Sequence, residues 1–185
     1  FTIDEDGLRV GAPWRASQHR IESLLVAHAH WITDKLAEWG DRRPPPFTWQ
    51  AGALIMVMGQ PLQLTPDPER EITERDGDRL YIAAGADNPD ALARHSLAWL
   101  RDLAYAWFGQ RAAHYAPVLG VAPPIIRLSN AKTRWGACHP SGRIHLNWRL
   151  IQMPPPLIDY VVVHELAHLH EPNHSPRFWR RVGDV

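Results

Sequence analysis

The stretch VVVHELAHL at residues 161–169 constrains the fold of this chain more than any other part of the sequence. Its apolar residues recur at helical spacing, which predicts a helix with one buried face. His164 and His168 lie four positions apart, and such positions share a face of a helix. Glu165 completes the pattern H-E-x-x-H. The two imidazoles can therefore bind one metal ion, and His174 follows closely enough to return as a third ligand.

A helical projection separates the metal-binding side of this helix from its buried side. At about 100° per residue, with Val162 at zero, Leu166 falls at about 40°. His164 and His168 then fall at about 200° and 240°, and Glu165 lies between the two sectors at about 300°. We therefore expect the aliphatic side to pack into the core and both histidines to face a cleft.

Zinc is the metal that suits these ligands. Neutral imidazole nitrogens bind Zn²⁺ at about 2.0–2.1 Å, and catalytic zinc sites combine three protein ligands with a water molecule. We expect one Zn²⁺ ion on His164, His168 and His174, with the pKa of its bound water lowered to about 7. Glu165 is placed to act as the general base and to pass the proton to a leaving amine. The chemistry predicted is that of a zinc hydrolase, and most simply that of a metallopeptidase.

The composition is that of an ordinary globular protein. The chain has 185 residues, of which 45% are hydrophobic and 22% charged, so we expect one domain with at most a smaller lobe. The single cysteine, Cys138, excludes an internal disulfide and fits a reducing compartment. Charged residues interrupt the first twenty positions, and no apolar run approaches the roughly 20 residues that span a bilayer. A cytoplasmic protein without a membrane partner is expected.

Charge is unevenly distributed along the chain. Residues 1–99 carry 10 Lys and Arg against 15 Asp and Glu, a net charge of −5, and residues 100–185 carry 10 against 5, a net charge of +5. The simplest interpretation is that the acidic residues solvate the N-terminal part. Without a basic run or stripe, the sequence does not support nucleic acid as a partner, although the basic half leaves it open.

Turn and periodicity signals divide the chain into short elements. Strands are predicted in a hairpin at residues 1–15 and at residues 53–58, 62–65, 70–73, 79–82, 125–128 and 143–148. Helices are predicted at residues 17–39, 88–115 and 157–170, with a last one beginning at Ser175-Pro176. Residues 42–46 are predicted to form a stiff polyproline connector.

These elements predict an α+β fold in two parts. Residues 1–88 are expected to form a β-rich lobe with one helix and a small antiparallel sheet. Residues 89–185 are expected to form a metal-binding catalytic domain, in which the H-E-x-x-H helix packs against a small mixed or antiparallel sheet.

Residues 134–179 resemble the YgjP-like metallopeptidases, zincins related to the SprT-like group. The resemblance rests on Arg-Trp-Gly-Ala-Cys at residues 134–138, on Gly142 with Ile144, Leu146 and Asn147, on residues 158–169, and on Asn173-His174-Ser175 with Phe178-Trp179. The sequence departs from the metzincin pattern, because it has Glu171 at the position where metzincins have glycine. His139-Pro140 also replaces the small polar residue usual in the YgjP-like family.

The resemblance implies a zincin-like fold for residues 89–185, and it implies a site as well. It implies that His164, His168 and His174 bind zinc and that Glu165 is the catalytic base. It further implies that the strand at residues 143–148 lines the cleft and pairs with an extended peptide substrate. The expected substrate cleft consists of Arg134, Trp135, His145 and Asn147, and the candidates for stabilising an oxyanion are Arg134, His139 and Tyr160.

Three other functions remain open at this point. A metal-dependent nucleotide phosphohydrolase, such as a nucleoside triphosphate pyrophosphatase, is suggested by Arg134, Arg143 and Arg149 near the site. A nucleic-acid-associated protease, as in the SprT-like group, is the second alternative, and a zinc-holding binding module without turnover is the third. No oligomeric state is predicted.

Overall fold

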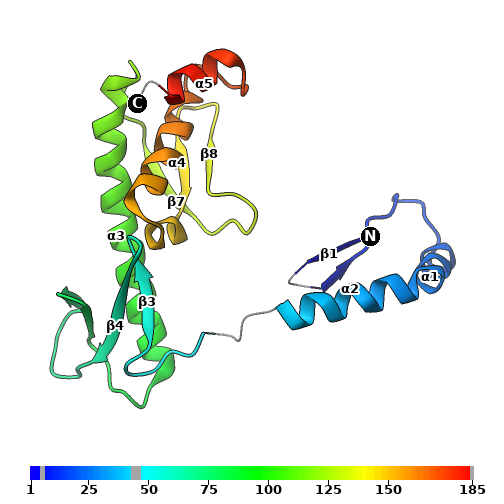
Figure 1. Ribbon diagram of the computed structural model, residues 1–185, viewed down its shortest axis with the longest axis horizontal. Helices are drawn as coiled ribbons and strands as arrows, with labels where there is room; N and C mark the ends of the chain where they lie inside the picture. The colour runs from blue at the N-terminus through cyan, green and yellow to red at the C-terminus, as the bar shows by residue number, and fades with distance from the viewer. Residues whose placement is uncertain (5–6, 43–46, 184–185) are drawn as a thin grey trace. The chain divides into compact units, whose positions relative to one another are not determined.

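The computed structural model describes residues 1–4, 7–42 and 47–183. The chain divides into two compact units, Phe1–Phe47 and Thr48–Val185, which are described separately (Figure 1). Helices and small sheets occur in both units, which confirms the α+β class. Within the described ranges, no helix has the length and apolar character needed to cross a membrane.

The first unit consists of a hairpin and two helices. The hairpin is formed by β1 (Thr2–Asp4) and β2 (Gly7–Arg9), which pair antiparallel as predicted. The helices are α1 (Gln18–Ala27) and α2 (Ala29–Arg42). Ser17 caps α1, because its side-chain oxygen accepts a hydrogen bond from the backbone N–H of Arg20.

The prediction of one helix at residues 17–39 is wrong in two respects. The backbone leaves helical geometry at His28, with φ −108° and ψ 11°, and this divides the segment into α1 and α2. α2 then continues past Gly40, the predicted stop, to Arg42. The predicted polyproline connector lies outside the described residues, apart from Arg42.

A four-stranded sheet begins the second unit. Its strands lie in the order β3-β4-β6-β5, with bounds β3 (Leu54–Val57), β4 (Gln60–Pro66), β5 (Glu74–Asp76) and β6 (Arg79–Ile82). Met58 and Gly59, at φ 49° and 76°, form the two-residue turn between β3 and β4, since both positions of such a turn need positive φ. β4 and β6 pair parallel, so this sheet is mixed and not antiparallel throughout as predicted.

The long helix α3 (Pro89–Val118) joins this sheet to the rest of the unit. Asn88 caps it, because its side-chain oxygen accepts a hydrogen bond from the N–H of Ala91 at 3.0 Å. Its fully buried residues recur every four positions from Leu92 to Ala116, and each step of four turns the buried face by about 40°. The helix therefore faces β6 near its start and α4 and β7 further along (Figure 1). Phe108 occupies the fully buried position in the middle of this face, whereas its neighbours Trp107 and Arg111 are half-buried.

A second sheet follows α3. It has the order β7-β9-β8, with bounds β7 (Ile126–Ser129), β8 (Gly136–Cys138) and β9 (Ile144–Asn147), and it leads into the 3-10 helix η1 (Trp148–Gln152). β7 and β9 match predicted strands, whereas β8 was not predicted. β9 is the central strand and β8 is an edge strand.

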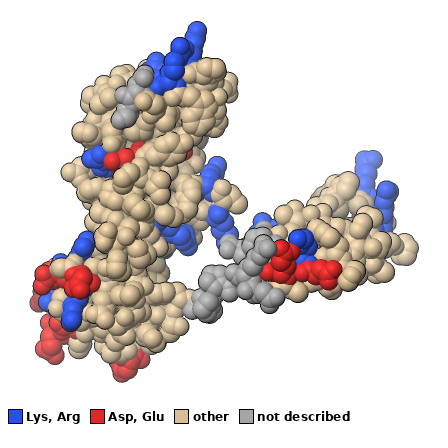
Figure 2. Space-filling view, in the orientation of Figure 1, with Lys and Arg blue, Asp and Glu red and all other residues tan. Residues whose placement is uncertain are grey.

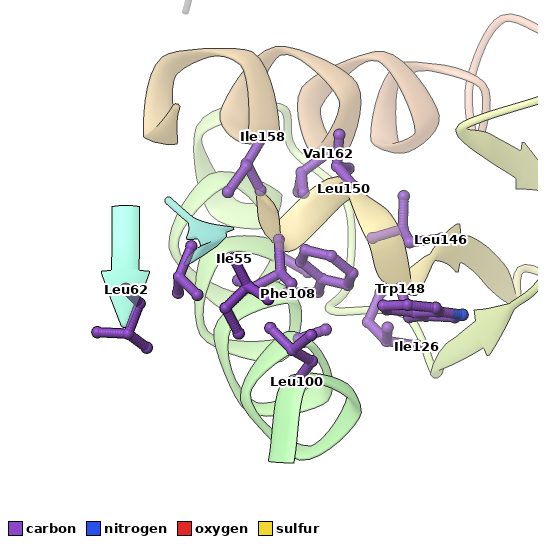
Figure 3. Packing of buried hydrophobic residues seen from close by; sticks show 14 of the residues in the cluster. Ile55, Leu62, Leu100, Phe108, Ile126, Leu146, Trp148, Leu150, Ile158 and Val162 are labelled. Atoms are coloured by element: carbon purple, nitrogen blue, oxygen red, sulfur yellow. The ribbon is translucent and has the colours of Figure 1, made fainter. Parts of the chain in front are cut away.

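One hydrophobic core connects both sheets of the second unit. Ile55 and Leu62 from the first sheet lie in the same cluster as Leu146 from the second (Figure 3). Phe108 and Leu100 of α3 lie between them in this cluster. The shared core explains why the compact units divide after residue 47 and not after residue 88, where the two parts of the fold were predicted to meet.

The last two helices carry the site. α4 (Pro155–Ala167) packs on α3, and α5 (Pro176–Gly183) packs on α4. α4 was predicted to reach residue 170, but it ends at Ala167 with His168 as its C-cap. A bidentate ion pair between Arg111 of α3 and Asp159 of α4, at 2.7 and 2.8 Å, fixes α4 against α3.

Candidate metal centre

Three histidines from α4 and the turn after it converge on one point. His164 lies in the last turn of α4, His168 caps it, and His174 comes back from the segment that precedes α5. One nitrogen of each imidazole lies within 4.8 Å of the other two. The opposite face of α4 is buried through Ile158 and Val162 (Figure 3). The helical projection therefore places both histidines of the motif correctly.

A hydrogen bond to the backbone orients the imidazole of His168 for metal binding. His168 Nδ1 lies 3.0 Å from the carbonyl oxygen of Glu171. Since a carbonyl only accepts, Nδ1 carries the proton and Nε2 is left with a free lone pair. This is the arrangement that orients metal-bound histidines in general. Glu171, noted in the sequence only as a departure from the metzincin pattern, thus contributes its backbone to the site.

The donor set fits a zinc ion. His164 Nε2 and His174 Nε2 face one another at 3.1 Å. A tetrahedral ion with zinc–nitrogen distances of about 2.0–2.1 Å separates two ligand nitrogens by about 3.3–3.4 Å. Burial, together with the nearby charges of His168 and His174, lowers the pKa of His164 to about 4. This imidazole is therefore neutral at physiological pH, which is the form that binds metals.

An aromatic floor lies behind the three histidines. Phe178 of α5 is fully buried, and its ring centroid lies 4.8, 4.6 and 4.8 Å from those of His164, His168 and His174. Trp179 stacks on His174 at 5.7 Å. The sequence reasoning noted this aromatic pair but gave it no role in the site. The available signal was that the pair lies four and five residues after the third histidine, near the start of a predicted helix.

Glu165 lies beside the histidines in an environment that favours its neutral form. The residue is 6% exposed, and burial raises the pKa of its carboxyl group to about 7. The backbone N–H of Cys138 and the positive charge of Arg134 act in the opposite direction. Oε2 is buried without a hydrogen-bond partner among the described residues. The carboxyl group therefore has one oxygen available and a pKa near neutrality.

Gly136 of β8 leaves room for this carboxyl group. A Cβ atom at this position would lie 2.4 Å from Glu165 Oε1 and 2.6 Å from its Cγ. These distances are far below van der Waals contact, so any side chain at residue 136 would displace Glu165. The glycine of the Arg-Trp-Gly-Ala-Cys run at residues 134–138 thus has a steric reason next to the carboxylate.

The histidines and Glu165 open into one cavity of about 520 Å³. One wall is β8 and the turn after it, and the other is α4 with the segment that follows. The lining residues are Gly136, Ala137, Cys138, His139, Pro140, Gly142, His164, Glu165, His168, Leu169, Pro172 and His174. Cys138 lines the cavity but does not belong to the group of three histidines. Burial and the charge of Glu165 raise the pKa of its thiol.

The four residues predicted to form the substrate cleft do not line this cavity. Arg134 and Trp135 are exposed just before β8, and His145 is exposed on β9. Asn147 is buried, and its side chain donates to the carbonyl oxygen of Ala131 at 2.7 Å. Asn147 therefore holds the loop before β8 in place.

The prediction that the strand at residues 143–148 pairs with a substrate is also wrong. β9 already pairs with β7 on one side and β8 on the other, so it has no free edge. The edge strand that borders the cavity is β8. Of the predicted oxyanion donors, His139 lines the cavity, whereas Tyr160 is half-exposed with its ring 6.0 Å from that of His164.

A protein-family model and a solved structure match this chain. The family described as YgjP-like, metallopeptidase domain, matches residues 1–185. None of the curated proteins matches the chain. Among solved structures, the crystal structure of the metallopeptidase zymogen of Pyrococcus abyssi abylysin is 28% identical, covering 42% of this chain and 78% of that one, with a TM-score of 0.40. The family match spans the whole chain, including the histidines, Glu165 and β8, and the chain therefore belongs to the YgjP-like metallopeptidase domain family.

Proposed function

We propose that this protein is a zinc-dependent peptidase in which His164, His168 and His174 hold one Zn²⁺ ion and Glu165 is the general base. The observation that carries the proposal is the convergence of three imidazoles beside a buried carboxyl group on one cavity. A bound zinc ion supplies an activated water molecule and polarises the scissile carbonyl. Membership of a metallopeptidase family supports peptide bonds as the target.

Glu165 moves the protons in this proposal. Its free Oε2 accepts a proton from the attacking water and later donates it to the leaving amine. A carboxyl group can perform both steps, because it takes up one proton and returns it within the same reaction. The N–H of Cys138 and the space at Gly136 hold the carboxyl group in position.

The substrate is proposed to be an extended segment of a peptide or protein that lies along β8. An edge strand offers unpaired backbone groups to which a peptide can add as a further strand. β8 has such an edge and also forms one wall of the cavity with the histidines. This assignment replaces β9 as the strand that pairs with substrate.

A phosphohydrolase has less support from the same cavity. No Lys or Arg is among the described residues that line it, and Arg134, whose charge reaches Glu165, is exposed outside the lining, so the cavity wall itself offers a polyphosphate no cationic side chain. Figure 2 shows basic side chains in separate groups on the visible face and no continuous basic stripe. This face therefore offers nucleic acid no extended basic surface.

The test combines metal analysis with two substrate classes. Purified protein is expected to contain one zinc per chain and to cleave unfolded casein, and to release no phosphate or pyrophosphate from nucleoside triphosphates. Glu165→Gln should keep the zinc and lose the cleavage. Glu171→Gln is the matched control, because Glu171 contributes its backbone carbonyl and not its side chain. Cleavage retained by Glu165→Gln would exclude Glu165 as the base, and phosphate release alone would favour the phosphohydrolase.

A further inference from the structure

A tight turn after β8 brings one more histidine to the cavity. His139 and Gly142 close the turn, with the Gly142 N–H bonded to the His139 carbonyl at 2.8 Å. The His139 N–H in turn bonds to the carbonyl of Arg143 at 2.8 Å, which ties the turn to the start of β9. His139 therefore sits on a turn held by backbone hydrogen bonds on the wall opposite α4.

The turn also determines which nitrogen of His139 carries the proton. The backbone N–H of Ser141 points at His139 Nδ1 at 3.2 Å, and a backbone N–H can only donate. Nδ1 must therefore be an acceptor, and the Ser141 hydroxyl, 2.9 Å away, donates to it as well. Arg143 Nε donates in turn to the Ser141 oxygen at 3.1 Å. In the neutral imidazole the proton is consequently on Nε2.

This makes His139 different from the other polar side chains of the cavity. His164, His168 and His174 form the candidate metal centre, and Glu165 carries the available acceptor oxygen. Apart from the thiol of Cys138, a weak donor, His139 is the remaining lining side chain of the described residues with a proton to donate. The proton is already on Nε2 before a ligand binds. A substrate oxygen that accepts a hydrogen bond from Nε2–H therefore does not have to shift a tautomer equilibrium.

We propose that His139 is a substrate-binding residue whose Nε2–H donates a hydrogen bond to a carbonyl oxygen of the bound peptide. The proposal rests on the proposed peptidase function for the class of substrate, since a peptide offers carbonyl oxygens along its whole length. It does not depend on turnover, because the hydrogen bond is part of binding.

The first test is the tautomer. A long-range ¹H–¹⁵N spectrum of the whole protein above pH 7.5 should show His139 as the Nε2–H tautomer, identified by loss of its signals in His139→Gln. Ser141→Pro removes the backbone donor and should leave His139 with a mixture of tautomers. An Nδ1–H tautomer in the unsubstituted protein would overturn the proposal.

The second test is binding to the zinc-loaded protein. The probes are an N-acetyl dipeptide hydroxamate, which carries peptide carbonyls, and acetohydroxamate, which carries only the metal-binding group. His139→Phe should weaken binding of the dipeptide probe about five- to tenfold, as expected for one hydrogen bond, and leave acetohydroxamate unchanged. His139→Gln, whose amide N–H₂ can replace the Nε2–H donor, should recover most of the affinity.

His145→Phe is the matched control, since His145 is exposed on the neighbouring strand and does not line the cavity. Equal affinity of wild type and His139→Phe for the dipeptide probe would overturn the proposal, and so would equal weakening of both probes. A protein that binds the dipeptide probe through His139 but cleaves no peptide would instead contradict the proposed peptidase function.

Discussion

The two sheets of the second unit pack against the same helix and share one core, yet only one of them borders a polar site. The first sheet points Val57, Leu64 and Leu80 into the core, all at most 1% exposed. In the second sheet, all three residues of β8 are only half-buried, and one of them is a glycine. The first sheet therefore contributes burial, whereas the edge of the second contributes space and a backbone N–H to Glu165.

If this division is correct, substitutions at the site should remove chemistry without unfolding the core. His168→Ala is expected to have the largest effect, because it removes one of three ligands and leaves an incomplete metal centre. Zinc content should fall to near zero, and peptide cleavage should fall below detection. Metal analysis and a casein assay measure both quantities. His145→Ala, an exposed histidine on β9, should retain both, and full zinc occupancy in His168→Ala would refute the ligand assignment.

The role of Gly136 in positioning Glu165 can be tested by adding a single methyl group. Gly136→Ala places a Cβ 2.6 Å from Glu165 Cγ, which is near the backbone and cannot swing away as a carboxylate tip could. The carboxyl group should be displaced, and kcat should fall by about 10²-fold, the cost of a misplaced catalytic group, with zinc retained. Steady-state kinetics on a peptide cleaved by the wild type would measure this change.

Gly109→Ala provides the matched control for this substitution. Gly109 lies in α3, and a Cβ added there meets no atom within 4 Å, so kcat should not change. An unchanged kcat in Gly136→Ala would show that the gap beside Glu165 has no role in positioning it.

The same comparison explains which parts of the fold the sequence predicted. Local signals were sufficient where a single residue determines the backbone, as at the caps Ser17 and Asn88 and at the proline that opens α5. The shared helix face of His164 and His168 was also readable, because their spacing on one helix is a local property. The α+β class followed from the order of these elements.

Tertiary contacts determined what the sequence did not predict. β8 is only three residues long, and its Gly136 and Ala137 carry no strand signal, so it is a strand because β9 pairs with it. The assignment of the cleft to His145 and Asn147 failed because alternation along a strand gives its faces but not its neighbours. The order β7-β9-β8 removed the free edge that the prediction required.

The role of the first sheet can be tested with a core substitution that should change stability but not activity. Leu64→Ala should destabilise the protein by about 2–5 kcal/mol, because it opens a cavity at a residue that is 1% exposed. At a temperature where the variant is folded, its kcat and zinc content should equal those of the wild type. Leu54→Ala, on β3 and 59% exposed, should change stability by no more than about 0.5 kcal/mol. Urea denaturation with parallel kinetics would measure both, and loss of zinc in folded Leu64→Ala would break the distinction between the sheets.

The smallest effect is expected where α4 meets α3, the helix that both sheets share. Asp159 accepts two hydrogen bonds from Arg111 and one from Tyr115, at 2.7, 2.8 and 3.0 Å, and its side chain is 20% exposed. Asp159→Asn leaves the guanidinium without its counter-charge and should cost about 1–3 kcal/mol of unfolding free energy. Tyr115→Phe removes two hydrogen bonds, because the hydroxyl donates to Asp159 and accepts from Arg111, and should cost about 0.5–1.5 kcal/mol for each of them.

A double-mutant cycle on Asp159 and Tyr115 separates the strength of this contact from its effect on the site. The two side chains touch, so their effects on unfolding should not be additive. His164 lies five residues beyond Asp159, about one and a half turns along α4, and its ring is also held by Phe178 of α5. Zinc affinity should therefore change less than stability does in every variant of the cycle. A zinc affinity that falls in proportion to the lost stability would mean that the ion pair with α3, and not the aromatic floor from α5, holds the ligands in place.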